Sequence, residues 1–258
     1  MKTLVYLMVL LAGLTGLGAG CTQKADLSLI MEPEPELLAE AGLDGRVAEQ
    51  MRLKDQISKL LELSSSLMVE MEASDAKAGI VKTDLVKSEL ADKINEARLS
   101  AVELEQASGP DWAKVKSQGQ LALNALAETY LDSLVKFNQN VGEAKKIQPV
   151  DQEVRIMGKN ALAARLKQIK ENLAGLLVRV EPRTNGMNPE VLEEWDRAKE
   201  KLAEQLFLSY KKINELSLKS GSWERLYVAA KDQLAELSRL YVSAQAKHDI
   251  ERASLTIK

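Results

Sequence analysis

The side chains best suited to catalysis or metal binding are scarce in this chain of 258 residues, which contains one cysteine, Cys21, and one histidine, His248. A thiol acts as a nucleophile or metal ligand and an imidazole as an acid–base group, but both need partner groups nearby. His248 falls on a helical seam where an earlier stretch has Phe137, so we interpret it as structural. The sequence has no Gly-rich phosphate loop, no Gly-x-Ser-x-Gly and no Glu-x-x-His pair. We therefore expect no catalytic residue, no metal site and no cofactor.

Cys21 lies at the end of a segment with a distinct composition. Lys2 precedes an almost wholly apolar run over residues 3–17, and the small residues Gly18-Ala19-Gly20 lead to the cysteine. The run is short for a membrane span and is typical of a segment read by the secretion machinery. The whole pattern resembles the signal peptide and lipobox of a bacterial lipoprotein. The alternative is an uncleaved anchor helix with an incidental cysteine.

The resemblance implies where the protein is located. Residues 1–20 would be the signal peptide, and mature Cys21 would carry the lipid that attaches the chain to a membrane. The usual pattern has leucine three places before the cysteine, whereas here Gly18 holds that place and Leu17 lies one further back. Thr22 follows the cysteine where an aspartate would retain the protein in the inner membrane. The resemblance thus implies the periplasmic side of the outer membrane, if the source bacterium has two membranes.

Composition indicates a folded, helical protein behind a short linker. Hydrophobic residues make up 45% of the chain, charged residues 28% and aromatic residues only 4%, a balance typical of long helices. Residues 21–45 include Pro33 and Pro35, which favour extended backbone, so we predict a flexible Pro/Glu tether there. The net charge is −3 with both signs interspersed, which argues against a nucleic-acid partner because that would require a clustered basic face.

An internal repeat organises the remaining chain. Residues 46–72 match 155–181, 80–109 match 192–221, and 112–131 match 223–242, in the same order. Apolar residues recur in steps of three and four, as Leu90, Ile94, Ala97, Ala101 and Leu104 do, and this spacing predicts amphipathic helices. A Ser-Gly turn precedes a tryptophan in both copies. We interpret the pattern as the tandem duplication of a three-helix unit.

The predicted fold is all-α, an elongated helical bundle with coiled-coil packing in two tandem three-helix units, 46–146 and 151–254. Gly142 and Pro149 interrupt the chain between them. We predict helices at 46–72, 80–107 and 112–141, then one that follows Asp151 and reaches 181, one from 189 to 219 and one from 223 onward. Asp151 and Asn188 are the predicted N-caps. The weak break at 73–79 leaves an alternative, in which the first two helices form one uninterrupted rod.

Three tryptophans are the candidate partner contacts. Trp112, Trp195 and Trp223 are all predicted in first turns of helices, where they either anchor the helix or form a binding hot spot. We expect a lipid-anchored, non-catalytic cell-envelope protein that acts as a helical scaffold or protein-interaction module toward other envelope proteins. The alternative is a periplasmic carrier or chaperone-like holdase that binds an apolar ligand or client, which would expose an apolar patch along the bundle.

Overall fold

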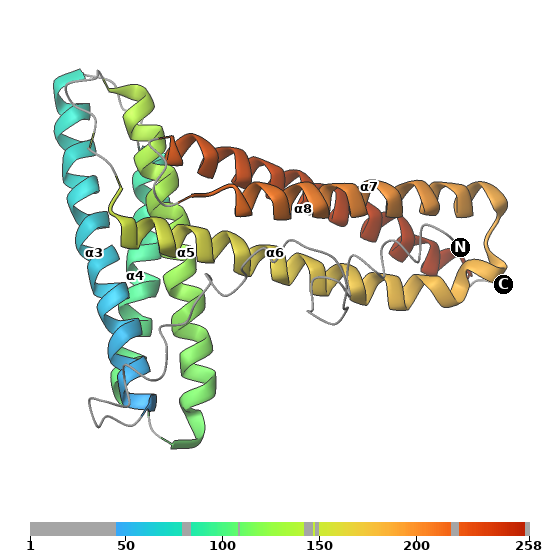
Figure 1. Ribbon diagram of the computed structural model, residues 1–258, viewed down its shortest axis with the longest axis horizontal. Coiled ribbons are helices and arrows are strands. Elements are labelled where there is room, and N and C mark those ends of the chain that lie inside the picture. The colour runs from blue at the N-terminus through green and yellow to red at the C-terminus, as the bar shows by residue number, and fades with distance from the viewer. Residues whose placement is uncertain are drawn as a thin grey trace. The chain divides into compact units, whose positions relative to one another are not determined.

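The computed structural model describes residues 45–78, 84–107, 109–141, 147, 150–217 and 222–255 (Figure 1). The helices are α3 (Gly45–Ala78), α4 (Asp84–Gln106), α5 (Trp112–Asn140), α6 (Gln152–Val180), α7 (Pro189–Asn214) and α8 (Trp223–Leu255), with short 3-10 helices at Gly109–Asp111 and Glu181–Gly186. Every regular element in these residues is a helix, which confirms the all-α bundle. The predicted signal peptide, Cys21 and tether lie outside the described residues.

The chain divides into two compact units, and the division falls inside α6. One unit contains the described residues up to Ala161, and the other begins at Leu162. The sequence repeat predicts the boundary ahead of α6, between residues 146 and 151. The start of α6 groups with the earlier helices, and an ion pair between Lys59 of α3 and Asp151, directly before α6, is one of the contacts that hold it there.

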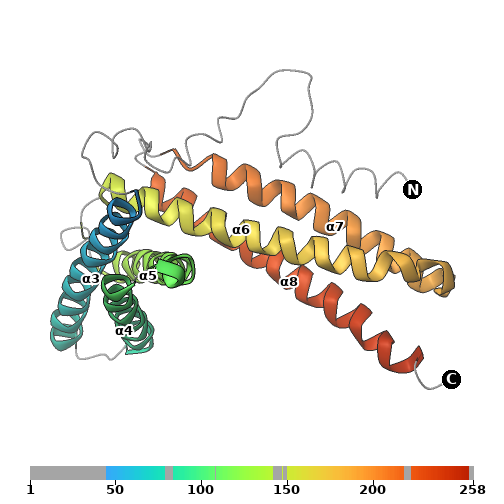
Figure 2. The same cartoon turned by 90° about the horizontal axis from the view of Figure 1, so that it is seen from below.

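The first unit, which ends at Ala161, is an up-down-up bundle of α3, α4 and α5, which lie side by side in Figures 1 and 2. The side-chain amide of Gln50, early in α3, donates to the carbonyl of Leu104, late in α4, so these helices are antiparallel. Lys116, early in α5, forms a 2.7 Å ion pair with Glu49, so α3 and α5 are parallel. The buried side chains repeat at the predicted helical spacing and include Leu53, Ile57, Leu60, Leu67, Met71, Leu90, Ile94, Ala97, Leu104, Leu123, Leu126, Tyr130, Leu134 and Phe137.

The end of α3 differs from the prediction. The helix continues through the expected break at 73–79 as far as Ala78. Residues 73–78 contain alanine, lysine and aspartate but no glycine or proline, so nothing in them stops a helix that has already formed. The alternative of one uninterrupted rod is wrong, because α3 and α4 pack against each other as separate helices.

The second unit, which begins at Leu162, has the same order of helix directions. Glu181, directly after α6, forms a 2.9 Å ion pair with Lys199 of α7, and Lys247, late in α8, forms a 2.5 Å ion pair with Glu194, early in α7. Adjacent helices are therefore antiparallel. The predicted cap is confirmed: the Asn188 side chain accepts the N–H of Glu190 at 3.0 Å, and Pro189 is the first helical residue.

The end of α7 also differs from the prediction. The helix ends at Asn214 rather than residue 219. Beyond it, the N–H of Leu216 donates to the carbonyl of Ile213 at 3.2 Å, and the Leu216 side chain is fully buried. The chain therefore leaves the helix early while it keeps Leu216 in the core. The spacing of apolar residues in the sequence does not distinguish a leucine buried within a helix from one buried just after the helix ends.

Candidate interaction surface

A lysine joins the first two helices of the first unit. Lys87 of α4 forms ion pairs with Asp75 of α3, at 3.0 Å, and with Asp84 of its own first turn, at 3.1 Å. Hydrogen bonds to Asp75 and Asp84 raise the pKa of the Lys87 ammonium above its ordinary value. This cluster ties the end of α3 to the start of α4, so its role is structural.

The second unit has the equivalent cluster, and there it is more deeply buried. Lys199 corresponds to Lys87 in the repeat, and it forms ion pairs with Glu181 at 2.9 Å and Asp196 at 2.8 Å. Its side chain is 6% exposed, against 19% for Lys87, and its Nζ lies 5.7 Å from the centre of the Trp195 ring. Burial lowers the pKa of Lys199, but the hydrogen bonds to Asp196 and Glu181, together with the negative charges of these two groups, raise it by more. The ammonium is therefore held charged inside the unit.

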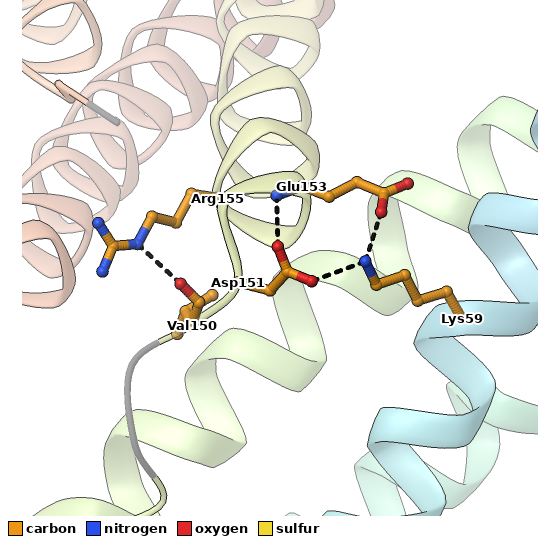
Figure 3. Close-up of polar contacts among 5 residues, drawn as sticks. All are labelled: Lys59, Val150, Asp151, Glu153 and Arg155. Carbon is orange, nitrogen blue, oxygen red and sulfur yellow. Dashed lines mark hydrogen bonds and ion pairs between the residues drawn. The ribbon is translucent and has the colours of Figure 1, made fainter. Parts of the chain in front are cut away.

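A third polar cluster fixes the start of α6 against α3 (Figure 3). Asp151 accepts the N–H of Glu153 at 3.1 Å, which confirms Asp151 as the N-cap. Lys59 of α3 donates to Asp151 at 2.7 Å and also to Glu153. The Arg155 Nε donates to the carbonyl of Val150 at 2.9 Å, which holds the chain just before the helix.

Asp151→Ala removes both the cap and an ion pair, and we expect it to lower the free energy of unfolding by about 1 kcal/mol in a urea titration. The bond from Lys59, followed by the bond from the Glu153 N–H, lowers the pKa of the Asp151 carboxyl. A lowered folded-state pKa means that the stabilisation is present above about pH 4 and is lost as the pH falls further. Glu153→Ala leaves the cap intact and serves as the control. An equal loss in both variants would show that the cap contributes nothing.

The tryptophans predicted as partner contacts are placed differently from one another. Trp195 and Trp223 are 0% and 1% exposed, and the Trp223 ring stacks on Tyr227 with a centroid distance of 5.1 Å. Trp195 also lies in the second turn of α7 rather than the first, since that helix begins at Pro189. Only Trp112, the first residue of α5, keeps accessible surface. Of the three, Trp112 is therefore the one that a partner could reach in this fold.

His248 lies within α8, but its side chain is not among those that the structure describes. Its counterpart in the first copy, Phe137, is buried. In the part of the chain that the structure describes, no group of three or more His, Cys, Asp or Glu side chains is placed to hold a metal ion. A structural role for His248 stays a prediction.

Large apolar side chains are exposed at ten described positions, spread over all six α-helices. They are Met51, Val69, Leu85, Leu99, Val102, Leu121, Ile156, Val178, Phe207 and Val242. Among them only Leu99 and Val102, which are 68% and 48% exposed, lie within one turn of each other on the same helix. This pair forms an apolar patch on the side of α4 away from its buried stripe.

A groove adjoins this patch where α4 ends and α5 begins. It has a volume of ≈ 420 Å³ and is lined by Glu103, Gln106, Ala107, Asp111, Lys114, Val115 and Gln118. The two helices approach closely here, because a Cβ at Gly119 would lie 2.9 Å from the Cδ1 of Leu104. Leu99, Val102, Trp112 and the groove residues are together called the α4–α5 surface below. Sequence reasoning missed this surface, although Leu99 and Val102 are visibly off the predicted α4 seam.

The groove carries more negative than positive charge. Its ionisable side chains are the two carboxylates of Glu103 and Asp111 and the one ammonium of Lys114. None of the three forms an ion pair with another described residue. Unpaired carboxylates beside exposed aliphatic side chains suit a partner that is both basic and apolar.

No protein-family model matches the chain, and neither a curated protein nor a solved structure is significantly similar to it. None of the helices in the described residues is both long enough and apolar enough to span a membrane.

Proposed function

We propose that the protein is a lipid-anchored, non-catalytic interaction module of the bacterial cell envelope. The observation that carries this proposal is the α4–α5 surface, which combines an apolar patch on α4, a charged groove between α4 and α5, and a half-buried tryptophan at the start of α5. Such a combination is typical of protein-binding surfaces, in which an aromatic or aliphatic centre is bordered by polar groups. The signal-peptide resemblance and the lone Cys21 support the anchoring.

The carrier or holdase alternative has less support. Binding an unfolded client calls for a broad apolar surface. The exposed large apolar side chains of the described residues lie singly on their helices, apart from Leu99 and Val102. A partner that recognises a small, defined site accounts better for this distribution. The proposal also includes the location in the cell envelope, the attachment to the outer membrane and the absence of catalysis.

Site-specific photocrosslinking in intact bacteria tests the interaction role. A photoreactive amino acid is placed in turn at exposed positions of several helices, namely Leu85, Val102, Leu121, Phe207 and Val242. An interaction module should give one or a few discrete adducts with envelope proteins from a subset of positions. A smear of many adducts from all positions would favour the holdase. No adduct from any position would contradict the proposal.

A further inference from the structure

We infer that the α4–α5 surface docks a partner segment in which an arginine or lysine side chain is flanked by aliphatic residues. The inference rests on the proposed interaction function and names its site and the chemistry of its partner. The basic group would enter the groove between Glu103 and Asp111, and the aliphatic side chains would cover Leu99 and Val102.

The charge of the groove selects the basic group. Glu103 and Asp111 are both exposed, and neither has an ion-pair partner in the described chain. A guanidinium presents a planar fork of N–H donors that matches a carboxylate, and an ammonium presents three donors. The side-chain amides of Gln106 on α4 and Gln118 on α5 add hydrogen-bonding groups to the lining of the groove. An acidic partner, or a membrane with anionic headgroups, would meet repulsion from the two carboxylates.

The apolar patch fixes where the rest of the segment lies. Leu99 and Val102 are separated by one turn on α4, and the groove residues Glu103 and Gln106 lie four positions after them, on the same face of the helix. Half-buried Val115, in the first turn of α5, lines the groove, and half-buried Trp112 is the first residue of the same turn. A segment that passes from α4 to α5 would therefore touch apolar surface on both sides of its basic residue.

The second copy of the repeat lacks this surface. Its residues at the positions of Leu99, Val102 and Glu103 are Lys211, Asn214 and Glu215. Glu215 is already bound to Lys212 at 2.9 Å, and the tryptophan that corresponds to Trp112 is buried. The first copy therefore has two apolar side chains and a glutamate without an ion-pair partner in the described chain at these positions. The second copy has three polar side chains there, and its glutamate forms an ion pair. Packing alone does not require this difference, since all six of these positions are outside the buried cores.

A peptide-display selection on the full processed chain in mild detergent tests the inference. A random library of short displayed peptides is the probe, and the affinities of recovered peptides are measured by fluorescence anisotropy. Recovered peptides should contain arginine or lysine beside leucine, isoleucine or valine. Glu103→Gln should weaken their binding by about tenfold, since one charge-assisted bond is lost. Val102→Ser should weaken it several-fold.

The repeat supplies the matched controls. Glu215→Gln and Asn214→Ser change the equivalent positions of the second copy and should leave the affinity unchanged. Circular dichroism melting of each variant confirms that the helices are intact. A scrambled peptide of the same composition should bind more weakly than the selected one. Equal binding of the scrambled peptide, recovery of peptides without a basic residue, or recovery of none would overturn the inference.

The experiments distinguish a failure of the assigned binding site from a failure of the proposed interaction function. Peptides that bind the Glu103→Gln and Val102→Ser variants as tightly as the wild type would overturn the assigned site. In that case the interaction function would stand if the crosslinking experiment gives discrete adducts from another helix. The absence of adducts from every position in intact cells would instead remove the proposed function itself.

Discussion

Replacing Lys199 by methionine is expected to lower the free energy of unfolding by about 2–3 kcal/mol in a urea titration followed by circular dichroism. Methionine keeps most of the aliphatic packing, so the loss reports on the charge. Without the ammonium, the Glu181 carboxylate keeps the 3.3 Å hydrogen bond from the Trp195 indole. The expected loss is below that of a fully buried pair because the Asp196 side chain is half exposed and remains hydrated.

Lys87→Met is the matched control, because Lys87 holds the equivalent position in the first copy. It should destabilise the protein less, since the Lys87 side chain is 19% exposed against 6% for Lys199, so its charge is better screened by water. The raised pKa of Lys199 means that its contribution is complete below about pH 10 and is lost at more alkaline pH. A loss for Lys87→Met equal to or above that for Lys199→Met would contradict this account.

Cys21→Ser is expected to abolish lipid modification completely. The lone cysteine behind the apolar segment is the only thiol available for a thioether to diacylglycerol, and a serine hydroxyl does not replace it. Metabolic labelling with a fatty-acid probe and mass spectrometry of the product measure the result: wild type should be labelled and processed at Cys21, and the variant should accumulate as an unlabelled precursor. A variant that is still acylated and cut at the same place would show that Cys21 is not the lipid-bearing residue.

Thr22→Asp provides the matched control for this prediction. It leaves the cysteine in place, so labelling should be unchanged. By the lipoprotein resemblance, the aspartate should shift the protein to the inner membrane fraction. Loss of labelling in this variant would mean that the segment is sensitive to any nearby change, and the Cys21→Ser result would then not report on the thiol.

The helices could be predicted because their signals are local. The three-and-four spacing located each α-helix of the described residues, and the side chains of Asp151 and Asn188 cap α6 and α7 as their types and positions indicated. The two misplaced ends, those of α3 and α7, have different causes. In α3 the residues before Gly79 favour continuation, whereas in α7 the burial of Leu216 outside the helix depends on tertiary packing.

The candidate site was less predictable because exposure depends on the partners of a residue in the fold. Trp112 and Trp223 occupy equivalent places in the repeat and follow the same Ser-Gly pair, yet one is half buried and the other fully buried. Leu99 and Val102 differ from seam residues only by their place on α4. Whether Glu103 is paired is likewise decided by neighbours, since its counterpart Glu215 has a lysine three residues before it.

The Lys59 contacts with Asp151 and Glu153 join residues 92 and 94 positions apart in the chain. Contacts between residues so far apart in the sequence form only after the intervening segment has been synthesised and has closed into a long loop. In a chain that emerges from a ribosome or a secretion channel N-terminus first, α3, α4 and α5 are available to pair before Asp151 appears. The Lys59 contacts therefore become possible only after all of α3, α4 and α5 has emerged, and until then the nascent chain leaves Lys59 without these carboxylates.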